Sequence, residues 1–170
     1  GSEMCIRDSH SNFSLAEGML SFDYLSEFCT KNNQPAIAIT DTSNMFGVLE
    51  FSIEMVSNGI QPIIGIQVNI SGATNLDNSI GEVVLIAKNE IGYKNLLVLT
   101  SKLSNNSEFD KFINYEDLKN YRDGIILLTG GIENGFVGKP ASLGNIKLVN
   151  ERLGVLKELF EDNLLSLIHI

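Results

Sequence analysis

The stretch PAIAITDTSNMFGVLEF, residues 35–51, carries the alternation of elements on which the fold prediction depends. Its first six residues are apolar or β-branched apart from Pro35, and they predict a short buried strand over 35–40. The polar residues 41–46 predict a loop, and the apolar periodicity that follows predicts a helix over 47–58. The residues expected on the inward face of that helix are Leu49, Ile53 and Val56.

The same order of strand, loop and helix recurs on both sides of this stretch. A helix is predicted over 22–32 with Ser21 as its N-cap, because a serine there can accept a backbone N–H. Further strands are predicted over 63–70, 82–87 and 124–129, and further helices over 89–103, 115–120 and 145–160. The continuous apolar run over 83–86 favours a parallel strand covered on both faces. Short connections between alternating elements indicate an α/β layer or barrel, with functional side chains on loops that follow strands.

Composition restricts the classes of function. The chain has 170 residues, which suits one domain or a large piece of one, and 44% of them are hydrophobic, which is enough for a core. Lys and Arg number 12 against 21 Asp and Glu, so the net charge of 12 − 21 = −9 argues against a surface built to grip nucleic-acid phosphates. Cys5 and Cys29 form no CxxC pair, so neither a disulfide scaffold nor a zinc knuckle is expected, and a reducing cytoplasm is the natural compartment.

The two ends differ from the rest. Gly1-Ser2 resembles a cloning scar, and the apolar run LLSLIHI closes the chain at 164–170. We expect residues 1–9 and 165–170 to be non-native or disordered flanks around a domain over 10–164, so His169 is not a candidate site residue. No apolar run in the sequence reaches the length of a membrane span, and the first residues lack the basic-then-apolar pattern of a signal peptide.

Two residues are candidate metal ligands from the pattern alone. Asp41 follows an apolar strand, where an oxygen ligand can face the mouth of a barrel, or where a carboxylate can cap the loop by accepting backbone N–H groups. His10 can be a ligand or a hydrogen-bonded loop histidine. Glu82 begins a predicted strand and is expected to be a solvated end residue, and Gly130-Gly131 can approach a ligand or form an ordinary turn.

Five segments in order resemble the PHP (polymerase and histidinol phosphatase) domain of bacterial DNA polymerase III alpha subunits. They are HSNFSLAEGML (10–20), PAIAITDTSNMFGVLEF (35–51), GIQPIIGIQVNI (59–70), VVLIAKNEIGYKNLLVLTSKL (83–103) and INYEDLKNYRDGIILLTGG (113–131). The GY-x-NL within the fourth segment is characteristic of alpha subunits. The resemblance runs from about residue 10 to about residue 164 and implies a distorted (β/α)7 PHP barrel that is truncated before its last strands.

The resemblance also implies a degenerate metal site. His10 and Asp41 match family ligands, and Glu82 stands where a ligand His is common, so these three are the candidate vestigial metal ligands. Other ligand positions are altered: Asp8 replaces a His, Thr42 follows Asp41 where many members have His, Gln67 replaces an acid, and Gly131 replaces a Cys. We therefore expect no catalytic residue, no cofactor and no occupied Zn or Mn site in this chain, with Mg serving the parent polymerase.

By the same resemblance, the parent protein synthesises DNA. This domain is expected to act as a scaffold and as a docking site for the proofreading exonuclease subunit, joined to the remainder of the alpha chain. DNA is contacted only through other domains, and no membrane is involved. The alternatives are a metal-dependent PHP phosphoesterase of the histidinol-phosphatase type, which needs more histidines than the two present, and a pure binding module. The reading frame after residue 170 separates them.

Overall fold

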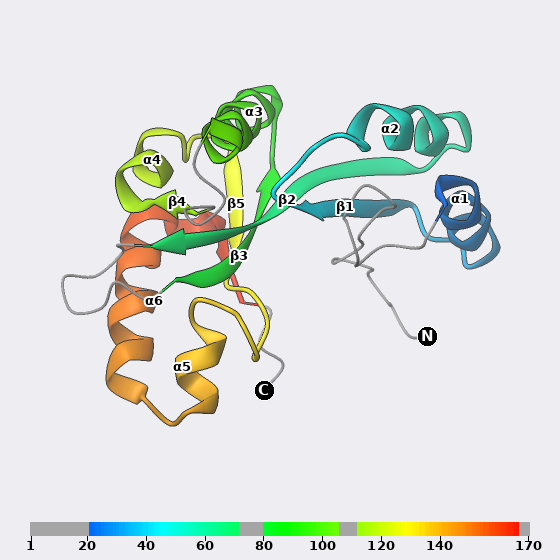
Figure 1. Ribbon diagram of the computed structural model, residues 1–170. Helices are drawn as coiled ribbons and strands as arrows, with labels where there is room; N and C mark the ends of the chain where they lie inside the picture. The colour runs from blue at the N-terminus through cyan, green and yellow to red at the C-terminus, as the bar shows by residue number, and fades with distance from the viewer. Residues whose placement is uncertain (1–20, 72–79, 106–111, 167–170) are drawn as a thin grey trace. The chain divides into compact units, whose positions relative to one another are not determined.

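The computed structural model describes residues 21–71, 80–105 and 112–166. The helices are α1 (Phe22–Lys31), α2 (Val48–Ser57), α3 (Glu90–Asn105), α4 (Tyr115–Asn120), α5 (Gly138–Ser142) and α6 (Ile146–Phe160), with a 3-10 turn η1 at Glu161–Asn163. The strands are β1 (Ala36–Thr42), β2 (Gln61–Ser71), β3 (Gly81–Ala87), β4 (Ile113–Asn114), β5 (Ile125–Leu128) and β6 (Leu164–Leu165). The α/β class predicted from the sequence is confirmed (Figure 1).

Two compact units make up the chain, Gly1–Ile66 and Gln67–Ile170, and their boundary falls within β2. Strand order follows β1-β2-β3-β5-β6 among the described strands, and β4 pairs with β2. The strand β2 therefore contributes to both units.

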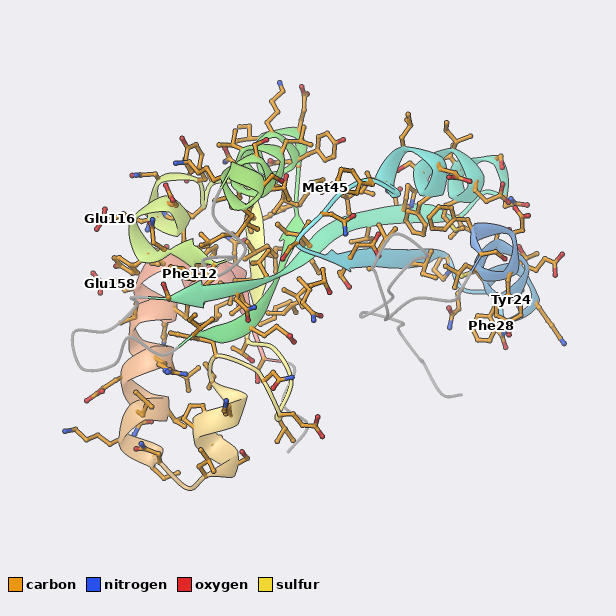
Figure 2. All side chains as sticks on the ribbon, viewed as in Figure 1. Tyr24, Phe28, Met45, Phe112, Glu116 and Glu158 are labelled. Atoms are coloured by element: carbon orange, nitrogen blue, oxygen red, sulfur yellow. The ribbon has the colours of Figure 1, made fainter. Side chains whose placement is uncertain are left out.

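The first unit is held together by packing between α1 and α2. Ser21 caps α1 as predicted, since its hydroxyl accepts the Tyr24 N–H at 3.4 Å. On the inner side of the pair, the Phe22 and Phe51 rings meet edge to face with centroids 5.6 Å apart. Figure 2 shows Tyr24 and Phe28 on α1, which are four residues apart.

The inward face predicted for α2 is wrong. Its buried side chains are Val48, Phe51 and Met55, at 6%, 0% and 0% exposure. The predicted inward residues lie on the opposite side and are exposed: Leu49, Ile53 and Val56. Both sets recur at helical spacing, so the periodicity of the sequence is compatible with either rotation of the helix.

The second unit is a mixed sheet with helices packed on it. Strand β3 pairs antiparallel with β5, in the register Val84↔Leu128, so the parallel arrangement expected for this apolar run is wrong. Val83, Val84 and Leu85 are buried nonetheless, and α3 packs on β3 (Figure 1). Parallel pairs join β2 to β4 at Ile70↔Ile113 and β5 to β6 at Leu127↔Leu164.

The chain end after α6 takes part in this sheet. Leu164 and Leu165 form β6, and the Leu165 carbonyl accepts the Thr129 N–H at 3.1 Å. The boundary predicted at residue 164 thus falls inside a strand. The flanks 1–9 and 167–170 lie outside the described residues, and whether the ends are native stays a prediction.

Candidate functional site

Asp41 lies within β1 rather than in the loop predicted to contain it. The strand continues to Thr42, and Asp41 is 1% exposed next to the fully buried Thr40. A buried carboxylate needs compensating interactions. Asp41 takes part in at least one further interaction, so its burial alone is no evidence for a metal ion.

The loop after β1 is organised by Asn44. Its side-chain oxygen accepts the Phe46 N–H at 3.2 Å, and its Nδ2 donates to the Thr42 carbonyl at 3.0 Å. Between them, Ser43 has a positive φ of 57°. These contacts form a tight Asx-type turn. Loop capping was one of the two roles expected for Asp41, and in the structure Asn44 caps this loop.

Glu82 is half-buried at the start of β3, and its backbone is paired with the segment after β5. The Glu82 N–H donates to the Asn134 carbonyl at 2.9 Å, and its carbonyl accepts the Phe136 N–H at 2.8 Å. Glu82 and Gly135 form a parallel bridge. The backbone of Glu82 is therefore held in the fold, while its side chain is partly exposed at the start of the strand.

The two glycines that follow β5 differ in their surroundings. Gly130 has a φ of 76°, and a Cβ added to it would lie 2.3 Å from the Glu82 carbonyl oxygen. Gly131 is exposed, and nothing lies within 4 Å of a Cβ added there. Gly130 therefore permits a close approach between two backbone segments, as expected if the glycine pair forms a turn. Gly131 has no side chain at the position where the family resemblance expects a Cys ligand.

The described donor set does not fit a metal centre. Within residues 21–71, 80–105 and 112–166, no group of three His, Cys, Asp or Glu side chains is placed to hold an ion. Asp41 belongs to the first unit and Glu82 to the second, and Gln67 is a buried amide at 9% exposure. His10 and Asp8 lie outside the described residues. A protein zinc site ordinarily needs three or four ligands, and the described residues alone do not bring that many together.

The pKa values of Cys29 and Lys102 are shifted, and neither of these side chains is a candidate ligand. Burial raises the pKa of the Cys29 thiol, which keeps it protonated and unreactive. The Lys102 pKa is raised chiefly by its hydrogen bond to Asp117, whose Oδ1 lies 2.7 Å from the ammonium nitrogen. Both shifts belong to structural contacts. None of the helices within the described ranges is long and apolar enough to cross a membrane.

The sequence model of the PHP-domain family matches residues 8–167 of this chain. The chain belongs to the PHP-domain family. The match spans both units, and with the α/β architecture above it identifies the fold as a partial PHP barrel.

Curated relatives of this PHP domain are polymerase subunits. The chain is 33% identical over 156 residues to the DNA polymerase III subunit alpha of Haemophilus influenzae, which covers 91% of this chain and 13% of that protein. It is 38% identical over 133 residues to the subunit alpha of Rickettsia felis, covering 77% of this chain and 11% of that protein. The chain thus spans about an eighth of the length of these relatives.

Among solved structures, an amidohydrolase from Chromobacterium violaceum with bound sulfate and no metal shares 18% identity at a TM-score of 0.44. The structural alignment covers 56% of this chain and 31% of the amidohydrolase chain.

The alpha-subunit motif of this PHP domain, Gly92–Leu96, has a packing role. A Cβ on Gly92 would lie 1.8 Å from the Gly124 carbonyl oxygen, so α3 approaches the turn before β5 closely. Asn95 Nδ2 donates to the Asp123 carbonyl at 2.8 Å, and Leu96 is fully buried. The contacts of Gly92 and Asn95 join α3 to the turn at 123–124.

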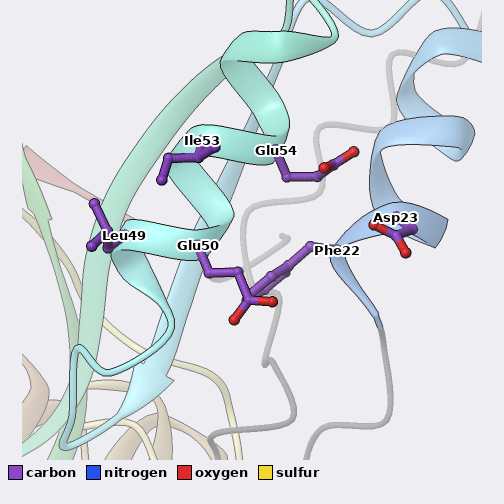
Figure 3. Close-up of a pocket in the computed structure, with 6 residues that line it drawn as sticks. All are labelled: Phe22, Asp23, Leu49, Glu50, Ile53 and Glu54. Atoms are coloured by element: carbon purple, nitrogen blue, oxygen red, sulfur yellow. The ribbon is translucent and has the colours of Figure 1, made fainter.

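Sequence reasoning missed a groove in the first unit. It lies between α1 and α2 and has a volume of about 280 Å³ (Figure 3). Its lining residues are Phe22, Asp23, Leu49, Glu50, Ile53 and Glu54. The available signal in the sequence was the apolar stripe Leu49, Ile53 and Val56 of α2, which had been predicted to face the core.

Proposed function

We propose that this PHP domain is the N-terminal part of a replicative DNA polymerase III alpha subunit. In that protein it serves as a catalytically silent scaffold and as a docking site for the proofreading exonuclease. The observation that carries the proposal is the match to subunit alpha, which reaches over 91% of this chain at 33% identity. A domain similar to so small a share of its relatives is best explained as one part of a larger machine.

The contacts made by the family motifs support the scaffold role. Gly92 and Asn95 fix α3 against the turn before β5, and Gly130 allows the following segment to pair with β3. The motifs are thus used for packing. The proposal of catalytic silence is supported by Gln67 and Gly131, which stand in the sequence where the family resemblance expects ligands.

The chemistry of the whole protein is assigned to other domains. DNA-directed nucleotidyl transfer, with its Mg, would lie in parts of the polymerase outside this chain, and DNA would be bound there. The net charge of −9 agrees with a domain that does not itself grip the phosphate backbone. The proposed compartment is the cytoplasm, without a membrane contact.

The direct test uses the full-length polypeptide that is encoded through residue 170 and beyond. The reading frame should continue for several times the length of this chain, and the purified polypeptide should extend a primed template. Removing residues 10–164 should abolish co-elution with the exonuclease subunit. A stop codon soon after residue 170, or equal exonuclease binding by the deleted polypeptide, would refute the proposal.

A metal-dependent phosphoesterase is the alternative function. It requires a water made nucleophilic by a bound metal near neutral pH. No described cluster favours such a centre, so the alternative serves as the competing outcome of the metal measurement that closes the Discussion.

A further inference from the structure

Helix α2 exposes an apolar stripe on the side opposite its buried face. Its members are Phe46, Leu49, Ile53 and Val56, which are 78%, 73%, 63% and 64% exposed. They are spaced three, four and three residues apart, so those within the helix share one face. Scattered exposed apolar residues are ordinary, but several in register on one helix are typical of an interaction surface.

The stripe borders the groove between α1 and α2, because Leu49 and Ile53 belong to both. Phe22, which is 8% exposed, lies at the groove between the two helices (Figure 3). Its ring packs edge to face on Phe51, so the apolar wall is anchored in the core of the first unit.

The groove is held in shape by hydrogen bonds of Glu54. Its Oε1 accepts from the Ser26 hydroxyl at 2.9 Å and from Asn58 Nδ2 at 2.7 Å. The first bond connects α2 to α1 directly, and the second joins adjacent turns at the end of α2. A preformed groove loses little conformational entropy on binding, which favours affinity.

The charge around the groove is acidic. Three of its six lining residues are Asp23, Glu50 and Glu54. Over residues 21–66 the chain carries one base, Lys31, and five acids, Asp23, Glu27, Asp41, Glu50 and Glu54, so the net charge there is 1 − 5 = −4. An occupant with Lys or Arg beside its apolar side chains would complement this rim.

We propose that the α1–α2 groove docks a basic amphipathic helix of a partner protein. Apolar side chains of that helix at i, i+3, i+4 and i+7 would pack on Leu49, Ile53 and Phe22, and its flanking Lys or Arg would meet the acidic rim. This goes beyond the scaffold proposal and does not depend on it, since the partner is defined by its chemistry. A second copy of this chain is disfavoured, because self-pairing would bring Glu50 and its neighbours against like charges.

A designed peptide of about five helical turns tests the groove. The probe has Leu at the four apolar positions and Lys beside them, and the matched peptide has Glu in place of each Lys. Binding of each labelled peptide to the whole chain is measured by fluorescence anisotropy. We expect the basic peptide to bind, the acidic peptide to bind at least about tenfold more weakly, and added salt to weaken the basic complex.

Variants locate the binding. L49S combined with I53S should weaken the basic peptide about tenfold or more, since two exposed anchors are lost, and E50K should weaken it about threefold to tenfold. The matched control is I91S, an apolar residue on α3 that is 58% exposed, and it should change nothing. Circular dichroism of each variant checks that the fold is retained.

Four results would overturn the proposal. Equal binding of both peptides, or binding insensitive to L49S with I53S, would mean that the groove is not the site. Dimerisation that is lost in the same double variant, measured by ultracentrifugation, would assign the stripe to a second copy. Protection of Leu49 from hydroxyl-radical footprinting in the free monomer would show that the chain itself covers it.

Discussion

The guanidinium of Arg152 lies over the ring of Phe136, with its central carbon 4.3 Å from the ring centroid, and its Nη1 donates to the Phe136 carbonyl. Arg152 is 3% exposed on α6, and Phe136 is 1% exposed in the segment that pairs with Glu82. One side chain therefore connects the last long helix to the segment that holds the start of β3.

Replacing Arg152 should destabilise the second unit. R152A removes a charge-assisted hydrogen bond and a cation–π contact and leaves the Phe136 carbonyl buried, which should lower the free energy of unfolding by about 2–4 kcal/mol. R152K keeps the charge but loses the planar stacking, so an intermediate loss is expected. Urea unfolding of both variants measures the difference, and equal stability of R152A and the parent would contradict this role.

Two adjacent glycines should respond differently to alanine. In G130A the new Cβ would meet the Glu82 carbonyl and the residue would be strained at positive φ, so a loss of about 2 kcal/mol or more is expected. In G131A the Cβ enters open space, and the change should stay within about 0.5 kcal/mol. Thermal melts compare the pair, and a larger loss in G131A would mean that the turn is misread.

Gly92 in the alpha-subunit motif can be compared with Gly154, a glycine on another helix. G92A would place a Cβ against the Gly124 carbonyl and should separate α3 from the turn before β5, at a cost of about 2 kcal/mol or more. G154A lies on α6 with open space around it, and alanine in a helix should stabilise by about 0.5–1 kcal/mol. Hydrogen exchange of the α3 amides should quicken in G92A alone, and unchanged exchange there would count against the packing role.

The contribution of the Lys102–Asp117 pair to folding stability should be lost at alkaline pH. Because the folded-state pKa of Lys102 is raised above 10.5, the pair stabilises fully below that pH and its contribution is lost as pH rises through the raised value. K102M should therefore show a shallower fall of Tm above pH 10.5 than the parent. The control is K94M, since Lys94 pairs with Glu90 on an exposed helix face at 69% and 80% exposure. A profile of K102M identical to the parent would contradict this.

Local sequence signals predicted much of the fold. Ser21, Asn89 and Asn145 were placed at helix starts, and each accepts a backbone N–H from its own first turn. Helix boundaries were predictable because capping depends on residues three apart in sequence.

Features that depend on distant contacts were not predictable in this way. Two apolar stripes on α2 are compatible with either rotation of the helix, and the observed one packs the Phe51 ring on Phe22 of α1. The direction of β3 relative to β5 and the approach of Gly130 to Glu82 join residues about 40 apart or more, which no local period encodes. For the candidate site, Asp41 was placed one element too late, and the position of His10 lies outside the described residues.

The metal content of the chain tests the central claim, that this PHP domain is a scaffold without catalysis, most directly. The chain is dialysed against buffer with Zn or Mn and then without metal, and bound metal per chain is measured by elemental analysis beside a phosphate-release assay. The account predicts less than stoichiometric metal and no turnover, in the parent and in D41A alike, because Asp41, Glu82 and His10 do not suffice where Gln67 and Gly131 stand at ligand positions. One tightly bound metal per chain, lost in D41A together with measurable hydrolysis, would contradict it.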